Sequence, residues 1–444
     1  MATLIISNCT EEIVGDLAEL SDEMKKAFGW GAQRLLWYAQ EGDVVILPAE
    51  PDPAFLGYVV ATTGVPASSL SILVPPPGVL GGDLLSPDRL ADEGFREELR
   101  KVAAERTIDG VIACYADISI PELVTSVGID GALPGCAFIA EGGNVLVNSK
   151  AVFRAVAAGA GIPIAPGVVT GNRHHAERTI NGLLGDGYDV MVKREFGGGG
   201  FGNEILSPAP GVQAAGAPNV VVLPDEAAVA GYLEERWEWL TGGKGDRLVI
   251  ERFFPGSVTV YAEFDATGDG CELRGSGEIM MDPIAVGEIV PPVSVSPQAL
   301  ATLVEEGRRL CDLFRLMGYR GNICADAILT RDGQIVFTET NGRLTASTHL
   351  HVNVARRIVG EEHRDERVLL ERGRVLKGTS FPEALERLYA SGLAYDPDTR
   401  LGVLFTGDYV PINGNITYTI VARGVESARD IERRLRLLSA DAAA

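Results

Sequence analysis

The chain has 444 residues, 46% hydrophobic residues and a net charge of −22. This length allows roughly two to four domains with sizeable cores. The acidic balance, without any basic run, argues against nucleic acid or an anionic membrane as a partner. No segment has the pattern of a membrane span or a secretory signal. The six cysteines show no metal-binding spacing, so we expect free, buried thiols in a reducing cytoplasm.

Residues 1–140 predict an α/β domain. Short apolar runs at Thr3–Ser7, Asp43–Leu47 and Gly110–Ala116 have the pattern of buried parallel strands, and Trp30–Gln40 that of a helix. No glycine-rich phosphate-binding pattern follows the first strand. We therefore expect this domain to be a scaffold or a wall for a substrate.

A lysine opens the next predicted helix, which covers Ala151–Ala158 and ends at Gly159 and Gly161. A cation in the first helical turn is unfavourable beside the positive end of the helix dipole. Two interpretations of Lys150 stay open. It faces an anion, or it is an ordinary surface lysine.

A glycine-rich segment, Gly197–Gly202, joins two predicted strands, Asp189–Arg194 and Asn203–Leu206. It contains the pattern GxGxxG, but a dinucleotide-binding fold needs a helix after the glycines, and here a strand follows. We expect a hairpin whose backbone N–H groups close over phosphates. Lys193 at its base would supply a point charge. A mobile surface turn is the alternative.

The next segment predicts a helix over Asp225–Leu240 and strands over Arg247–Phe254 and Val258–Phe264. Glu251 interrupts the first of these apolar strands. A buried carboxylate needs a partner, and a lysine or the amino group of an adenine would serve.

A long amphipathic helix, Pro297–Met317, leads into the central feature of the chain, a hairpin over Asn322–Arg343. Asp332–Gly333 between two apolar runs indicates a two-residue turn with positive φ at both positions. That turn would place Asp326 directly opposite Glu339.

Alternation along these strands would put Cys324, Asp326, Glu339 and Asn341 on one face, and Arg343 as well if the strand continues that far. Two carboxylates held about 5 Å apart at Cβ repel each other unless a cation lies between them. Carboxylate and amide oxygens are ligands that Mg²⁺ prefers. The alternative is a solvated edge hairpin with incidental acids. For His349 and His351, which follow the hairpin, we favour a structural role over a catalytic one.

The last part, residues 361–444, predicts a small α+β domain. It has strands over Leu401–Thr406 and Asn415–Val421 around an Asn413–Gly414 turn, and a helix over Ser427–Leu438. A further helix is predicted just before it, over Asn353–Gly360.

In this order the motifs resemble the ATP-grasp superfamily of carboxylate–amine ligases, over residues 141–350. The most specific part is Asp326 with the later run Glu339–Thr340–Asn341–Gly342–Arg343. The N-terminal segment resembles the pre-ATP-grasp domain of a narrower group, which contains the peptide ligase of pheganomycin biosynthesis, and the C-terminal tail fits that group too. The implied fold, of mixed α/β and α+β class, has two α+β subdomains that grip ATP (141–245 and 246–360). A pre-ATP-grasp domain (1–140) precedes them, and a small α+β domain (361–444) follows.

The resemblance implies ATP and Mg²⁺ as cofactors and a role for each matching residue. Lys150 and Lys193 would contact ATP phosphates, with Lys193 also near the adenine. The phosphate lid would be Gly198, Gly199, Gly200, Phe201 and Gly202, and the adenine hinge Glu251, Arg252, Phe253 and Phe254. Asp326, Glu339 and Asn341 would hold the metal, and Arg343 would stabilise the transferred phosphoryl group, so that Lys193 and Arg343 act in catalysis. Val258 replaces the ribose-binding acid of many members, which leaves ribose recognition open.

The implied reaction joins a carboxylate to an amine through an acyl phosphate and releases ADP and phosphate. In the narrower group the acid is an amino-acid derivative with a blocked or guanidino nitrogen. The amine is a peptide N-terminus, and the setting is cytoplasmic peptide-antibiotic biosynthesis. Arg274 and Arg320 are candidates for binding the acid, equally explained as surface residues, and a homodimer stays open.

Two alternatives compete with a ligase. One is a non-catalytic, regulatory ATP-binding protein on an ATP-grasp scaffold. The other is a phosphotransferase, suggested by His363–Arg364–Asp365. Leu370 stands where a kinase would carry its metal-binding asparagine, and no DFG motif exists.

Overall fold

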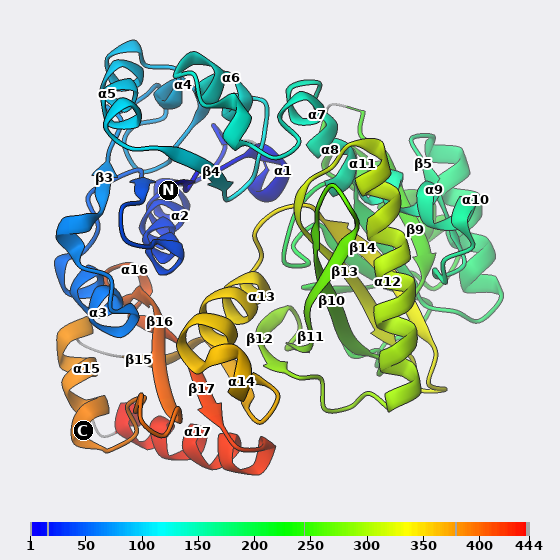
Figure 1. The fold of residues 1–444 in the computed structure, drawn as a ribbon. Helices are drawn as coiled ribbons and strands as arrows, with labels where there is room; N and C mark the ends of the chain where they lie inside the picture. The colour runs from blue at the N-terminus through cyan, green and yellow to red at the C-terminus, as the bar shows by residue number, and fades with distance from the viewer. Residues whose placement is uncertain (1, 16, 244, 378–379, 441–444) are drawn as a thin grey trace.

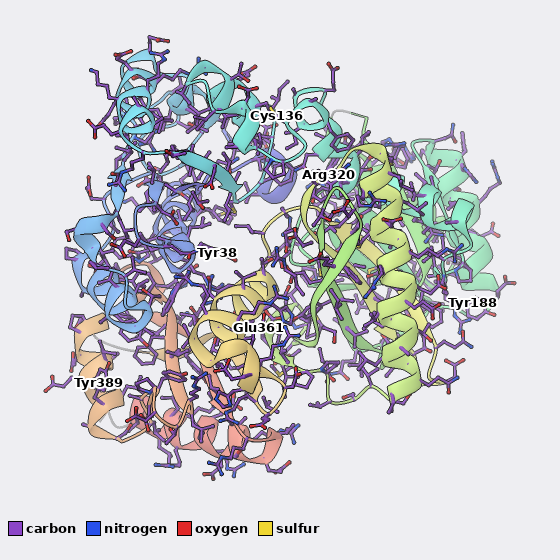
Figure 2. The ribbon with its side chains drawn as sticks, viewed as in Figure 1. Tyr38, Cys136, Tyr188, Arg320, Glu361 and Tyr389 are labelled. Atoms are coloured by element: carbon purple, nitrogen blue, oxygen red, sulfur yellow. The ribbon has the colours of Figure 1, made fainter. Side chains whose placement is uncertain are left out.

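The computed structural model describes residues 2–15, 17–243, 245–377 and 380–440. Three sheets of four, five and eight strands organise these residues. In Figure 1 the blue N-terminal and the orange and red C-terminal elements lie side by side, and the green and yellow middle of the chain forms the other side. Figure 2 shows Tyr38 in the N-terminal part and Arg320 across from it, in the middle part.

The N-terminal sheet is parallel, with strand order β3-β2-β1-β4. Its strands are β1 (Ala2–Ile6), β2 (Val44–Ile46), β3 (Ser71–Leu73) and β4 (Ile108–Ala113), and its longer helices are α3 (Pro53–Thr63), α5 (Glu93–Glu105) and α6 (Ser119–Ser126). The three predicted strands are confirmed. The helix predicted over Trp30–Gln40 is instead the end of α2 (Asp22–Gly31) followed by a 3-10 helix, η1 (Ala32–Tyr38).

The five-stranded sheet, of order β5-β9-β6-β7-β8, is antiparallel except for its last pair. Its strands are β5 (Gly167–Thr170), β6 (Val190–Arg194), β7 (Asn203–Ser207), β8 (Val220–Val222) and β9 (Leu248–Arg252). Helices α10 (Arg173–Gly185) and α11 (Glu226–Leu240) pack on it through one apolar cluster. The glycine-rich segment joins β6 to β7, so the predicted hairpin is confirmed and the dinucleotide-binding interpretation is excluded.

The eight-stranded sheet has the order β14-β13-β10-β11-β12-β15-β17-β16. Its strands are β10 (Val258–Ala266), β11 (Cys271–Met281), β12 (Ala285–Val290), β13 (Gly321–Leu329), β14 (Ile335–Asn341), β15 (Val368–Lys377), β16 (Gly402–Tyr409) and β17 (Asn415–Ala422). Helix α12 (Pro297–Met317), predicted with these bounds, buries its apolar face against β10 and β13. That packing leaves the other face of these strands for polar side chains.

The C-terminal strands continue this sheet rather than forming a separate one, because β15 pairs with β12. The boundary predicted near residue 361 therefore falls within one sheet, and the domain boundaries stay a prediction. Before β15 come α13 (Ala346–His349), a π-helix, η4 (Leu350–Gly360), and α14 (Glu361–Arg364). The helix predicted over Asn353–Gly360 is thus part of a longer helical segment. α15 (Phe381–Ala390) and α17 (Val425–Ala440) complete the C-terminal part.

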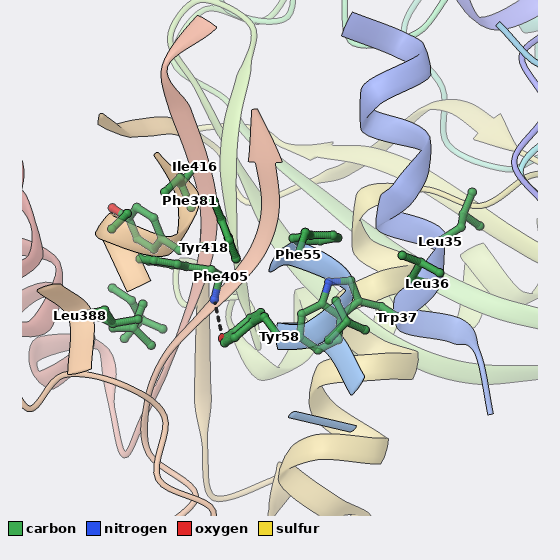
Figure 3. Packing of buried hydrophobic residues seen from close by; sticks show 14 of the residues in the cluster. Leu35, Leu36, Trp37, Phe55, Tyr58, Phe381, Leu388, Phe405, Ile416 and Tyr418 are labelled. Carbon is green, nitrogen blue, oxygen red and sulfur yellow. Dashed lines mark hydrogen bonds between the residues drawn. The ribbon is translucent and has the colours of Figure 1, made fainter. Parts of the chain in front are cut away.

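The two ends of the chain share one apolar core. Trp37, Phe55 and Tyr58 from the N-terminal part pack with Phe381 and Phe405 from the C-terminal part (Figure 3). The backbone N–H of Phe405 donates to the Tyr58 hydroxyl at 3.1 Å. Burial of each such side chain stabilises the fold by about 1.5–3 kcal/mol. This core fixes the N-terminal part against the sheet that carries the site.

Candidate active site

The β13–β14 hairpin places Asp326 directly opposite Glu339, and Cys324 opposite Asn341. This arrangement was predicted, but the turn that produces it was not. The backbone N–H of Thr330 donates to the carbonyl of Gln334 at 2.9 Å, and that of Gly333 to the carbonyl of Thr330 at 2.9 Å. Three residues therefore form the loop, and of the two predicted turn residues only Gly333 has a positive φ, of 83°.

A β-bulge restores the predicted register. Leu329 pairs with Ile335 near the turn, but the register shifts between Ala327 and Asp326, so that Thr338 is the extra residue. Bulges bend a strand and change the direction of nearby side chains. Here the bulge turns the Thr338 carbonyl toward Lys193, whose Nζ donates to it at 3.3 Å.

The two acids have opposite environments. Burial, with Glu339 next to it, raises the pKa of Asp326 to about 7. Burial opposes ionisation of Glu339 as well, but Lys150 and Lys193 outweigh it and lower the pKa of Glu339. Lys150 Nζ lies 3.1 Å from Glu339 Oε2, so the interpretation that Lys150 faces an anion is confirmed. One acid is thus held ionised and the other is poised to lose its proton to a cation.

The oxygens on this face suit Mg²⁺. The Asn341 amide donates to Asp326 Oδ2 at 2.7 Å, and Arg343 Nη2 donates to Asn341 Oδ1 at 2.7 Å. Among the described residues no group of three or more His, Cys, Asp or Glu could hold a metal ion. Mg²⁺ needs fewer protein ligands than that, because one or two carboxylates hold it while waters and substrate phosphates fill its other positions. Two carboxylates fit this pattern, and the amide oxygen would join them by turning from Arg343.

Glu251 has two cationic partners. Lys193 Nζ lies 2.6 Å from its Oε1 and Arg154 Nη1 lies 2.5 Å from its Oε2, with all three side chains buried. The predicted lysine partner is confirmed. Arg154 was missed, although a signal for it exists. It stands four residues after Lys150 on α9 (Lys150–Ala160), and residues four apart share a helix face.

The backbone after Glu251 is partly engaged. The N–H of Arg252 donates to the carbonyl of Pro166, and that of Phe253 to the carbonyl of Asp189, both at 2.8 Å. An adenine hinge at this place would therefore have to use Phe254 or the carbonyl oxygens.

The glycine hairpin lies over the same region. The Gly197 carbonyl accepts from Lys150 Nζ at 2.8 Å, which ties its first residue to the metal face. Gly197, Gly199 and Gly200 all have positive φ, and Phe201 at the tip is 59% exposed. The segment thus has the backbone freedom and the exposed position that a lid requires.

A cavity of about 240 Å³ opens beside Arg343, between the N-terminal part and the start of β13. Val111 and Ile112 of β4 form part of one wall. Arg274 and Arg320 also line this cavity, so neither is a surface residue remote from it.

The two histidines are buried. His349 is buried against the rings of Trp37 and Tyr38, and burial lowers its pKa well below the usual range. His351 Nε2 lies 3.1 Å from the Tyr261 hydroxyl. The six cysteines are all free, three of them buried and three half-buried.

Comparisons with known proteins agree with this architecture. Residues 32–129 match the family model of the pre-ATP-grasp domain, and residues 383–435 match that of the PGM1 C-terminal domain. No curated protein sequence is significantly similar to the chain.

Solved structures resemble the chain over almost its full length. The ADP complex of an N5-carboxyaminoimidazole ribonucleotide synthetase has a TM-score of 0.58 at 14% identity, with 98% of this chain and 95% of that one covered. Biotin carboxylase from Campylobacter jejuni has a TM-score of 0.59 at 12% identity, with coverage of 98% and 90%. The N5-carboxyaminoimidazole synthase of Aspergillus clavatus, solved with ADP, has a TM-score of 0.54 at 16% identity, with coverage of 91% and 100%.

The chain therefore has the ATP-grasp fold, with a pre-ATP-grasp domain before it and a further domain after it. Within the described residues, no helix is long and apolar enough to cross a membrane.

Proposed function

We propose that the protein is an ATP-dependent carboxylate–amine ligase that forms ADP. The observation that carries this proposal is the paired Asp326 and Glu339, with Asn341 beside them. Lys150 pairs with Glu339, Arg343 donates to Asn341, and Lys193 donates to the carbonyl of Thr338, next to Glu339. Oxygen ligands for Mg²⁺ next to three fixed cations are what phosphoryl transfer from ATP requires. The ATP-grasp fold and the ADP complexes of structurally similar proteins support the same cofactors, ATP and Mg²⁺.

In this proposal Asp326, Glu339 and Asn341 hold Mg²⁺, which would neutralise phosphate oxygens of ATP. Lys150 and Lys193 bind those phosphates, and the glycine hairpin, Gly198–Gly202, excludes water. A carboxylate oxygen of the acid attacks the γ-phosphorus, and the bond to the β–γ bridging oxygen breaks, so that ADP leaves. Arg343 stabilises the charge on the phosphoryl group during its transfer.

The second step forms the amide. The amine nitrogen attacks the acyl carbon, the bond to the phosphate oxygen breaks, and the nitrogen loses a proton. Positioning and charge neutralisation account for most of the rate enhancement in such transfers. The net charge of −22 makes the local cations necessary, since the rest of the surface repels ATP.

We further propose that the acid is an amino-acid derivative with a blocked or guanidino nitrogen and that the amine is a peptide N-terminus. These substrates belong to cytoplasmic biosynthesis of a peptide antibiotic. This part rests on the resemblance of the N-terminal segment and the C-terminal tail to the pheganomycin peptide ligase.

Nucleotide products test the reaction class. With candidate acids and amines, ADP and phosphate should form only when both substrates are present. Formation of AMP and pyrophosphate would contradict the proposal. Binding of ATP without turnover in any pairing would favour a regulatory ATP-binding protein, and phosphate found on a stable product would favour a phosphotransferase.

A further inference from the structure

The cavity beside Arg343 narrows the class of acid, provided that the proposed ligase reaction holds. Its volume of about 240 Å³ is smaller than the roughly 300–1,000 Å³ of pockets that enclose drug-sized ligands. A molecule of amino-acid size fits within this volume, whereas a peptide would extend out of it through the open side. The amine partner would therefore approach from outside, and the cavity belongs to the acid.

The cavity lies next to the metal face on the same sheet. Directly opposed residues of neighbouring strands share a face, and β10 pairs Glu263 with Cys324 and Asp265 with Asn322. Cys324 pairs in turn with Asn341. The pair Asp265–Asn322, which lines the cavity, is thus two residues along the strands, about 7 Å, from the row formed by Glu263, Cys324 and Asn341. An acid in the cavity could present a carboxylate at the Arg343 end to a phosphoryl group on the metal face.

The charges of the lining favour an anion. Among the described residues that line the cavity, three arginines, Arg274, Arg320 and Arg343, stand against one acid, Asp265. Arg274 Nη2 lies 2.6 Å from Asp265 Oδ2, so these two neutralise each other. Arg274 is the extra residue of a β-bulge between β10 and β11, a position that directs its side chain toward this partner. A guanidino or ammonium group on the acid would need a carboxylate in the lining. Among the described lining residues the only one is Asp265, which already pairs with Arg274.

Arg320 is held in place but lacks a counter-ion. Its Nη1 donates to the carbonyls of Arg315 and Tyr319, both at 2.7 Å. No carboxylate lies within 4 Å of it in the part of the chain that the structure describes. It precedes β13, six residues before Asp326, and therefore stands at the end of the cavity away from the metal face. A guanidinium fixed in this way is suited to a bidentate carboxylate.

Of the two kinds of acid named in the proposed function, the cavity favours the one with a blocked nitrogen over the one with a guanidino nitrogen, and we propose that this acid is a small dicarboxylic acid, such as an N-acylated acidic amino acid. Arg343 meets the carboxylate that reacts, and Arg320 binds the second carboxylate. The Arg274–Asp265 pair excludes cationic analogues. Apolar side chains of the opposite wall, among them Val111, Leu133 and Ile139, contact the uncharged body of the acid.

Three matched acids test this inference: N-acetyl-L-glutamate, N-acetyl-L-glutamine and Nα-acetyl-L-arginine. Their backbones are the same, and their side chains are negative, neutral and positive. Binding to the full chain is measured by calorimetry with Mg²⁺ and a non-hydrolysable ATP analogue. We expect N-acetyl-L-glutamate to bind about 10- to 100-fold more tightly than the glutamine compound, the range of one hydrogen bond to a charged group, and the arginine compound to bind most weakly.

Variants of Arg320 assign the effect to this residue. Arg320→Gln should remove the preference for glutamate over glutamine, and Arg320→Lys should retain part of it. Arg309→Gln, on the exposed side of α12, should leave it unchanged, and thermal melts verify that each variant is folded. A preference for glutamate that survives in Arg320→Gln, equal or tighter binding of the arginine compound, or binding of none of the three acids would overturn the inference.

Catalysis is measured separately. With hydroxylamine as the amine, an acyl phosphate gives a hydroxamate and phosphate. Acids that bind in the expected order and give neither ADP nor hydroxamate would overturn the proposed reaction while the binding site stands. Hydroxamate formed from the arginine compound in preference to the glutamate compound would overturn the binding site while the reaction stands.

Discussion

At the scale of single residues, the site depends on like charges held together by opposite ones. Asp326 and Glu339 face each other across two strands, and Lys150 and Lys193 keep Glu339 ionised. Glu251 shares Lys193 with the metal face and is itself balanced by Arg154. Lys150 and Lys193 therefore each contact a carboxylate. The phosphates of ATP would compete with these carboxylates for the two lysines.

Glu339→Gln should abolish turnover with little loss of fold. The amide keeps the shape of the side chain but removes the charge that binds Mg²⁺ and pairs with Lys150. Loss of a residue that only supports a metal ligand costs about 10- to 100-fold, so loss of a ligand should cost at least about 100-fold in kcat. ADP release measures the rate, and a thermal melt measures the fold. Glu305→Gln, an exposed acid on α12, is the matched control. Full activity in Glu339→Gln would remove the metal assignment.

At the scale of elements, the hairpin shows what the sequence does and does not reveal. Alternation of apolar and polar residues predicted both strands, their shared polar face and the pairing of Asp326 with Glu339. The three-residue loop and the bulge at Thr338 were missed, because each changes the register by one residue and the two changes cancel. A pattern of period two is blind to such paired shifts.

Gly200 offers a test of the glycine hairpin as a phosphate lid. Its φ is 83°, and a Cβ there would lie 2.9 Å from the Gly216 carbonyl oxygen. Gly200→Ala should therefore distort the hairpin and raise the KM for ATP by about 10-fold or more, the equivalent of one lost hydrogen bond of about 1.4 kcal/mol. Gly182→Ala is the control, since Gly182 lies inside α10 with nothing within 4 Å of an added Cβ. An unchanged KM in Gly200→Ala would exclude a role for this hairpin in holding ATP.

At the scale of the whole molecule, the unexpected finding is one sheet that runs from the metal face into the C-terminal part. Sequence patterns predicted β10, β13, β14, β16 and β17 but not the strands between them. β11, β12 and β15 mix polar and apolar residues without the regular alternation or the apolar run that marks a strand. The cavity could not be predicted either, since residues of β4 and β13 line it together, and only tertiary packing brings these strands to one place.

The pairing of β12 with β15 within this sheet predicts that the stability of the fold depends on pH. Glu288 of β12 lies directly opposite Glu371 of β15, and Glu371 pairs with Arg34 at 2.8 Å. Burial, with Glu371 beside it, raises the pKa of Glu288 from 4.5 to about 8. The folded state therefore keeps a proton that the unfolded chain releases near pH 4.5. The contribution of this proton to the free energy of unfolding is fully present below pH 4.5 and is lost as the pH rises toward 8.

Glu288→Gln should remove this dependence, because the amide cannot ionise. Between pH 5 and pH 8 the wild type should lose on the order of a few kcal/mol relative to the variant. Urea unfolding at several pH values measures the difference. Glu272→Gln, an exposed acid on β11, should behave like the wild type. Parallel pH profiles for Glu288→Gln and the wild type would show that Glu288 is ionised in the folded state.

In the proposed reaction the carboxylate of the acid attacks the γ-phosphorus of ATP, and the path of one oxygen atom reveals whether it does. An acid labelled with ¹⁸O in its carboxylate is incubated with the protein, Mg²⁺, ATP and an amine, and the products are analysed by mass spectrometry. We expect ADP together with inorganic phosphate that carries one ¹⁸O atom. Label found in AMP, with release of pyrophosphate, would contradict the proposed reaction.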